Sequence, residues 1–460
     1  MKRFLFLIFI GLLSCSGFAQ NIKILFFVVD SITIHGNHQT RQHIITREIT
    51  LKPGDTLFAD ELTNHLAKSK SNLLNASIFN FVHIDTISST KPGHIILDIN
   101  VIERWYIWPY PVFELADRNF NAWWRARNFE RVNYGTYINI ENFRGRKELL
   151  RLLLKFGFDK KFSLLYDIPY INKSQTLGLN IEGGFTGNHE VALKTNDQSE
   201  VVFYKNEDIY QRRDWFGKIL LTYRSAYNIT HYAGFFFQQT RLSDSLPMLA
   251  SEFWPSQKNL SMYGFLYRLK ADYRDYKHYP LHGSYYDTEA YLASVSNESN
   301  PSYSLEANYR KFWSLGGKWY ASGGLYGRLA ETPFLYSRGL GSDRYFARGY
   351  EYYLILGQKY FLSHFNLKYN FIPQKTFEIK PIHNDKFGLI HFASYVTIYS
   401  DIGYVGNNKE YLNTKLNNHL LASIGLGLDL ITYYDKVLRL EYSLNKEGEH
   451  GFFVHFMAIL

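Results

Sequence analysis

Residues 105–460 alternate apolar and polar side chains at every second position over long stretches. Between 263 and 274, aromatic and aliphatic residues occupy the odd positions, and charged residues occupy the even positions from 268 onward. The same period of two recurs at 303–310, 422–430 and 438–443. Because successive side chains of a strand point to opposite faces, this pattern predicts β-strands with one apolar and one polar face.

The alternation and the turns between its segments predict sixteen strands, at residues 103–116, 133–143, 148–158, 161–170, 175–194, 201–226, 229–242, 258–276, 281–296, 301–315, 317–330, 355–371, 388–401, 418–432, 436–445 and 450–460. An even number of strands returns a single-chain barrel to the side from which it started. The connection 331–354 then lies outside the cell, and the preceding domain lies in the periplasm.

Residues 26–104 mix helical and strand periods. A short strand near 32–34 is followed by a helical stretch that begins at Thr40 and by a second helix over 60–74. Two strands separated by a turn follow between 82 and 101. The order strand, helix, helix, strand, strand indicates a compact α+β module with one sheet face covered by helices.

These patterns predict a mainly β protein: a small α+β domain at 26–104, followed by a sixteen-stranded antiparallel transmembrane β-barrel at 105–460. A soluble β-sandwich can also alternate in this way, with its charged face in water. The barrel is favoured because the strands are long, the chain carries an export signal, and residues 105–460 show no second type of element. In lipid every backbone group must be paired, so such a sheet has to close on itself.

The first residues have the order of a secretory signal. Two basic residues precede an uninterrupted apolar run over 4–13, and small residues follow up to Ala19. This run is too short to span a bilayer, which takes about 20 residues. We therefore expect a signal peptide at 1–19, removed after Ala19. Lipidation of Cys15 is an alternative, because the residues before it form a loose lipoprotein cleavage pattern.

The composition makes several kinds of site unexpected. Cys15 is the only cysteine, so the mature chain has neither a disulfide nor a thiolate metal site. Without residues 1–19 the chain carries 49 Lys and Arg against 42 Asp and Glu, and because these charges are interspersed they imply no nucleic-acid partner. The histidines lack metal-ligand spacing, and no serine lies in a nucleophile elbow. We expect no enzymatic activity, no metal and no cofactor.

Short motifs along the chain resemble those of a known family. In the first domain they resemble the POTRA pattern, and they are Ile34-His35-Gly36-Asn37, Arg47-Glu48, Pro53-Gly54-Asp55, Ile78-Phe79 and Val101-Ile102-Glu103-Arg104. Farther on, Arg274-Asp275 with Pro280 and Gly283 resembles a periplasmic turn of the BamA/TamA superfamily of outer-membrane assembly and translocation barrels. The resemblance implies a periplasmic POTRA domain and a barrel in the outer membrane of a diderm bacterium.

Two further motifs resemble the loop-six region of this superfamily. Arg348-Gly349-Tyr350 is similar to the tip of the sixth extracellular loop, and Ser400-Asp401-Ile402-Gly403 resembles the strand on which that loop docks. The resemblance implies that Arg348 folds into the lumen and pairs with Asp401, since a buried arginine keeps its charge and needs a fixed partner. The alternative is a solvated loop arginine. Lys368 stands where relatives carry a glutamate, so no second acidic partner is expected there.

The resemblance implies a factor that inserts or translocates other proteins, without nucleotide or cofactor. A client segment would add a strand to the edge of the POTRA sheet at Phe81, Val82 and Ile84. The seam between the first and last barrel strands would open sideways, and its expected residues are Pro111, Phe113, Phe452, Val454, Phe456 and Leu460.

Two other functions stay open. The first is a protein-secretion or passive pore in the outer membrane, and the second is a structural or lipid-handling barrel. The expected partners are the outer-membrane lipid bilayer, unfolded β-barrel or secreted client proteins, and accessory periplasmic proteins or lipoproteins.

Overall fold

The computed structural model describes residues 26–115, 132–157, 159–206, 208–250, 254–332, 339–341, 345–378, 389–407, 414–432 and 436–457. The expected signal peptide with Cys15, and Leu460 at the end of the chain, lie outside these residues. Within the described part, no helix combines the length and the hydropathy needed to cross a membrane.

The first domain is a four-stranded sheet with helices packed against it. The strand order is β2-β1-β4-β3, in which β1 and β4 run parallel. Its core is apolar, and Val29, Ile45, Leu73 and Leu97 are fully buried. The elements are β1 (Phe26–His35), α2 (Gln42–Thr46), β2 (Thr56–Phe58), α3 (Ala59–Asn75), β3 (Phe79–Ser88) and β4 (His94–Glu103).

This domain differs from the prediction in two details. The first helix ends at Thr46, so Ile49 is buried outside it, and the short strand β2 lies between the helices. Tertiary contacts account for both. The backbone N–H of Thr50 is bonded by Ser69 of α3 at 3.0 Å, and β2 gains a ladder with β1 that joins Phe26 to Phe58. The hydrophobic period of the sequence does not predict the contact of Thr50 with Ser69 or the pairing of β2 with β1.

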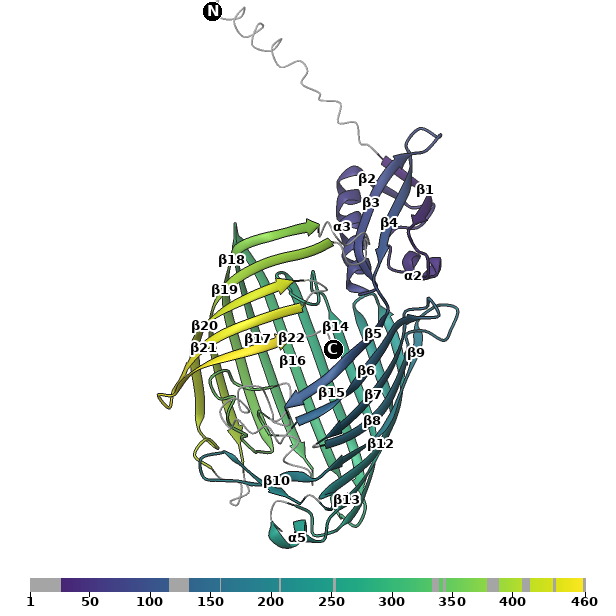
Figure 1. The fold of residues 1–460 in the computed structure, drawn as a ribbon. Helices are drawn as coiled ribbons and strands as arrows, with labels where there is room; N and C mark the ends of the chain where they lie inside the picture. Colours follow the sequence, from purple (N-terminus) through teal and green to yellow (C-terminus); the bar gives the residue numbers. More distant parts are fainter. Residues whose placement is uncertain are drawn as a thin grey trace, which may run out of the picture.

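The second region is one antiparallel sheet of sixteen strands, ordered from β5 through β9 and β12 to β22 (Figure 1). The mainly β fold and the strand number are as predicted. The strands are β5 (Ile107–Leu115), β6 (Val132–Phe143), β7 (Glu148–Gly157), β8 (Asp159–Ile168), β9 (Leu177–Asn188), β12 (Arg212–Ala226), β13 (Ile229–Leu242), β14 (Asn259–Asp272), β15 (Gly283–Val295), β16 (Ser302–Gly316), β17 (Trp319–Glu331), β18 (Lys359–Glu378), β19 (Leu389–Gly406), β20 (Leu420–Thr432), β21 (Lys436–Asn445) and β22 (His450–Met457).

Two predicted strands are wrong in extent. The segments 175–194 and 201–226 each contain two strands, because β10 (Glu190–Thr195) and β11 (Val201–Lys205) form a separate hairpin. This hairpin lies at the end of the barrel opposite the POTRA domain, as does the short helix α5 (Ser245–Leu249) (Figure 1). Alternation continues from the barrel strands into the hairpin, so the pattern alone does not mark where barrel pairing stops.

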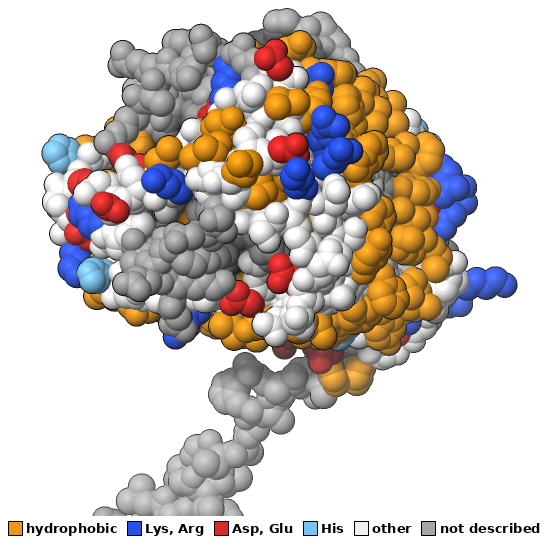
Figure 2. Space-filling model, turned by 90° about the horizontal axis from the view of Figure 1, so that it is seen from below, with side chains coloured by type: hydrophobic (Ala, Val, Ile, Leu, Met, Phe, Trp, Pro, Cys, Tyr) orange, Lys and Arg blue, Asp and Glu red, His pale blue; other side chains and the backbone are white. Residues whose placement is uncertain are grey.

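The predicted alternation separates the two faces of the barrel wall. Tyr263, Phe265 and Tyr267 on β14 are 65%, 45% and 41% exposed on the outer face. On the inner face, Arg268 of the same strand forms an ion pair with Asp287 of β15 at 2.5 Å. Figure 2 views the end opposite the POTRA domain, where hydrophobic side chains cover the side of the barrel and charged ones gather on the end face. This division suits a wall between lipid and a wet lumen.

The first and last strands are the two ends of the strand order. The ends of the sheet approach each other, because Lys436 Nζ on β21 lies 5.5 Å from the ring centre of Tyr110 on β5. The sheet therefore curls back on itself. We call the junction between β5 and β22 the seam.

The first domain is docked on the barrel turns that lie next to it through a buried ion pair. Both carboxylate oxygens of Glu48 accept hydrogen bonds from Arg224 of β12, at 2.7 and 2.9 Å. Burial raises the pKa of Glu48, but the hydrogen bonds with Arg224 and the charges of Lys147 and Arg47 outweigh it and lower the pKa to about 2. Glu48 thus stays ionised at neutral pH and anchors the domain.

Two more sets of contacts hold the junction. Asn75 at the end of α3 accepts hydrogen bonds from the backbone N–H and the ammonium of Lys277, both at 3.0 Å. On the other side, Thr40 accepts a hydrogen bond from Asn142 at 2.9 Å and donates one to Glu103 at 2.5 Å. Three separate parts of the domain therefore contact three barrel turns or strands, which fixes its orientation.

Replacing Glu48 by Gln should loosen this docking. Arg224 and Arg47 would then face each other without a carboxylate, and breaking a buried ion pair typically costs roughly 3–5 kcal/mol. We expect a broader distance distribution between spin labels at His83→Cys and Lys173→Cys, measured by pulsed electron paramagnetic resonance in a Cys15→Ser background.

The control for this change is Asp85→Asn, which removes an exposed carboxylate from the same domain. Adding Arg224→Gln to Glu48→Gln should narrow the distribution again, because the unpaired cation is removed. An unchanged distribution in the Glu48→Gln chain would show that the ion pair does not hold the domain.

Candidate functional site

The candidate site lies inside the barrel, on the loop between β17 and β18, of which 339–341 and 345–358 are described. Arg348 on this loop is buried and reaches Asp401 of β19. Its Nη2 lies 2.5 Å from Asp401 Oδ1, its Nε lies 3.0 Å from Oδ2, and its backbone N–H donates to Oδ2 at 2.9 Å. The carboxylate thus holds both the side chain and the backbone of Arg348.

Further side chains of the barrel wall surround this guanidinium. Nη1 of Arg348 donates to the side-chain oxygen of Asn366 on β18 at 2.7 Å. The guanidinium carbon lies 3.8 Å from the centre of the Tyr399 ring, which is a cation–π distance. His364 lies beside Asp401, with 2.9 Å between its Nδ1 and Oδ2. The Arg348 side chain is therefore bonded at each of its nitrogens and stacked on one face.

The two residues after Arg348 fit the barrel wall closely. Gly349 has a φ of +82°, and its carbonyl oxygen accepts a hydrogen bond from Asn445 of β21 at 3.0 Å. A side chain on Gly349 would be strained at this φ and would lie 3.3 Å from Ser443. Tyr350 is 2% exposed, and its hydroxyl donates to the carbonyl of Ala422 at 3.3 Å. These contacts lock the loop tip against β20 and β21.

A second acidic partner for Arg348 comes from β21, a predicted strand that was not among the expected partners of this loop. Glu441 of β21 lies 3.4 Å from Nη1 of Arg348. Lys368, which stands where relatives carry a glutamate, instead approaches Asp429 of β20 at 3.9 Å, and Arg439 binds the same aspartate at 2.6 Å. The expected lack of a second acid therefore applies only to position 368. Sequence gave no signal for Glu441 beyond its place on an inward face.

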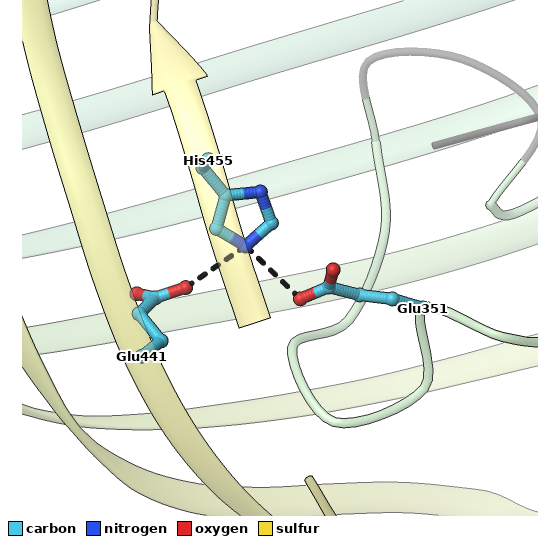
Figure 3. Close-up of side chains that lie close together, drawn as sticks. All are labelled: Glu351, Glu441 and His455. Carbon is cyan, nitrogen blue, oxygen red and sulfur yellow. Dashed lines mark hydrogen bonds and ion pairs between the residues drawn. The ribbon is translucent and has the colours of Figure 1, made fainter. Parts of the chain in front are cut away.

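The loop is also tied to the last strand through a three-residue cluster (Figure 3). Nε2 of His455 on β22 lies 3.2 Å from Glu351 of the loop and 3.2 Å from Glu441. Both carboxylates are buried. A protonated imidazole between two carboxylates would balance their charges and link β22, β21 and the loop.

The same cluster has the donor set of a metal site, since its three ligand atoms lie within 4.8 Å of one another. Metal-ligand spacing in the sequence does not predict this cluster, because its three residues come from different segments of the chain. Arg348 and Arg439 lie 3.4 and 3.9 Å from Glu441 and oppose a further cation there. The surroundings therefore favour a salt-bridge network over a metal centre.

The remaining predicted site residues lie at the periphery. Gly403 is buried on β19, with space for a Cβ limited by Leu362 at 3.3 Å. At the seam, Phe113 and Phe452 are 74% and 59% exposed on the outer face, Pro111 is exposed, and Val454 is half-buried. The side chain of Phe456 and the whole of Leu460 lie outside the described part of the chain.

The predicted POTRA edge is β3, the last strand in the sheet order. Val82 is 2% exposed and faces the core, whereas Phe81 and Ile84 are half-buried. The ring centre of Phe81 lies 4.8 Å from that of His391 on β19. The edge therefore begins beside the end of barrel strand β19 that lies next to the POTRA domain.

Replacing Asp401 by Asn should release the β17–β18 loop. Arg348 would lose its closest negative charge inside the lumen, a change that costs roughly 3–5 kcal/mol in comparable buried pairs. We expect protease cleavage between 339 and 357 to become at least tenfold faster in the folded, detergent-solubilised chain. Glu298→Gln, on an exposed turn, is the control. Equal cleavage of all three chains would show that this pair does not hold the loop.

Comparison with known proteins concerns the first domain and the overall fold. Residues 27–104 match the POTRA family, described as a surface antigen variable number repeat. No curated protein matches the sequence.

Solved structures resemble the whole chain. CdiB from Escherichia coli has a TM-score of 0.55 and 9% identity, covering 93% of this chain and 75% of CdiB. CdiB from Acinetobacter baumannii has a TM-score of 0.53 and 13% identity, covering 94% and 73%. BamA from Haemophilus ducreyi lacking POTRA domains 1–3 has a TM-score of 0.49 and 15% identity, covering 94% and 83%. At these identities the likeness to CdiB concerns the fold. The chain is therefore a POTRA domain followed by a sixteen-stranded β-barrel that shares its fold with CdiB.

Proposed function

We propose that this protein inserts or translocates other proteins at the outer membrane, using its POTRA domain and the seam of its barrel. The observation that carries the proposal is the composition of the first strand. β5 contains Pro109 and Pro111, and proline has no N–H to give to a ladder. Prolines in sheets are confined to edges, so β5 has the character of an edge strand although it belongs to a barrel.

The last strand supports the same proposal. β22 spans eight residues, whereas β18 spans twenty. A proline-containing strand lacks some of the N–H groups that a ladder needs, and few bonds make a junction that opens at low cost. An opened seam presents unpaired backbone groups to lipid, where each unpaired group costs several kcal/mol. A client strand that pairs with these groups removes that cost.

The POTRA edge lies where a client would first meet the barrel. Phe81 at the start of β3 contacts His391 of β19, and Ile87 farther along β3 is 51% exposed. A client segment paired with β3 would therefore begin beside the barrel rim. This placement supports strand addition followed by transfer to the barrel.

Hydrogen bonds join three connections at the end of the barrel opposite the POTRA domain, and this argues against a passive pore. The backbone N–H of Leu354 on the β17–β18 loop donates to Ser199 of the β10–β11 hairpin at 3.1 Å. Ser199 in turn contacts Thr414, and Asn417 donates to the carbonyl of Leu356. Three connections thus hold one another across this end of the barrel.

Depletion of the protein in its host is the direct test of the proposed function. We expect other outer-membrane barrels to fall several-fold in the membrane fraction, with unfolded precursors accumulating, as quantified by mass spectrometry. Loss of one or two proteins would restrict the function to dedicated translocation. An unchanged proteome with altered permeability to small solutes would overturn the proposal in favour of a pore.

A cysteine pair across the seam should block the activity if clients use this route. In the Pro111→Cys/Val454→Cys chain, we expect oxidation to lower barrel insertion at least tenfold in a depleted host, and reductant to restore it. The control is Leu440→Cys/Val454→Cys, which joins β21 to β22 at directly paired positions and leaves the seam free. Full activity of the oxidised seam pair, with the disulfide verified, would exclude lateral opening.

A further inference from the structure

A cavity of about 250 Å³ lies at the junction between the POTRA domain and the barrel, away from the loop site. Its walls come from the POTRA segment around Arg47 and the end of α3, and from the inner faces and adjoining turns of β6 to β14. The cavity is therefore formed only when the two domains are docked. Its lining is more polar than apolar.

The charges around this cavity do not balance. Five cations line it against three carboxylates, and the lining set is Arg47, Lys147, Arg224, Lys270, Lys277, Glu48, Asp167 and Asp272. The carboxylates are already engaged by other groups. Glu48 binds Arg224, Asp272 binds Arg274 at 2.7 Å, and Asp167 accepts a hydrogen bond from Asn180 at 3.0 Å.

None of the three lysines of the cavity forms an ion pair with a carboxylate among the described residues, and of the three Lys277 donates instead to the backbone carbonyl of Asn75 at 3.0 Å. Among the described residues, no carboxylate lies within 4.0 Å of the ammonium of Lys147 or Lys270. Lys147 comes from the β6–β7 turn and Lys270 from β14. Thr222, which is 7% exposed, adds a buried hydroxyl to the same wall. Ammonium and hydroxyl donors facing an enclosed space are the groups that bind a small anion with several oxygens.

We propose that this cavity binds a phosphate group, and that the bound group bridges the POTRA domain and the barrel. A phosphate dianion matches the two unpaired ammonium groups in charge, and its oxygens can accept hydrogen bonds from several walls at once. The docked domain partly encloses the cavity, and its volume of about 250 Å³ suits a small group better than a polymer chain. Free phosphate and the phosphate of an organic monoester offer the same chemistry.

The electrostatics of the empty cavity support this assignment. Burial lowers the pKa of Lys147 to about 7, because the nearby cations Lys277, Arg224 and Arg47 add to it and Glu48 only partly offsets them. Burial likewise lowers the pKa of Lys277, with Asp272 and Glu48 opposing it. An anion in the cavity would raise both pKa values. Binding near pH 7.5 should therefore take up protons.

Calorimetric titration of the full chain in a neutral detergent tests the proposal. Inorganic phosphate and glycerol 3-phosphate are titrated separately at pH 7.5, in two buffers of different ionisation enthalpy. We expect one saturable site with proton uptake. The Lys147→Met/Lys270→Met chain should bind at least tenfold more weakly, and Lys173→Met, an exposed lysine on the neighbouring β8–β9 turn, should bind as the unaltered chain does.

The outcomes separate the sources and can overturn the proposal. Tighter binding of glycerol 3-phosphate would assign the site to an organic phosphate, and tighter binding of inorganic phosphate would assign it to the free ion. No saturable binding of either ligand, or equal binding by the double variant, would overturn the site. If the double variant does not fold, Lys147→Met alone should still weaken binding and abolish most of the proton uptake, whereas Lys147→Arg should retain binding.

Discussion

Closure of the barrel sheet is the constraint on which the rest of this structure depends. In lipid, each backbone N–H and C=O needs a partner, so the sixteen strands must return to where they began. Closure has to be made between β5, which carries two prolines, and β22, of which eight residues are described. The strand with the fewest backbone donors therefore lies at the seam, where the first and last strands of the barrel meet. A membrane protein that works by opening its wall would need its weakest ladder at this place.

The lumenal loop reinforces that junction from inside. Arg348 is buried with Asp401, Glu441 and Asn366 around it, and a buried charge of this kind fixes its surroundings because any shift leaves the charge unpaired. The network continues from Glu441 to His455 on the last strand. His455 therefore links the loop, through Glu351, to the last strand at the seam. A loop that moved would withdraw Glu351 from β22, and an opening β22 would pull on the loop.

The junction between the POTRA domain and the barrel also contains buried charges that need partners. Here the cations outnumber the carboxylates. Glu48 and Arg224 satisfy each other and fix the domain, whereas Lys147 and Lys270 line the same cavity without a direct ion pair. Concentrating like charges in a partly enclosed space is unfavourable unless an anion completes it. The docking surface is thus both an anchor and, with its anion, a place where a small ligand can alter how firmly the domain is held.

The sequence by itself determined the features that depend on local periodicity and on short motifs. Alternation every second residue predicted the strand number and the outward and inward faces, because each strand must present one face to lipid. Only the tertiary structure decided where barrel pairing ends and the β10–β11 hairpin begins, since both alternate alike. It also brought Glu351, Glu441 and His455 together from three segments, and enclosed Lys147 and Lys270 beneath the POTRA domain. Such groupings arise from sheet closure and domain docking, which join residues far apart in the chain, and no local pattern encodes them.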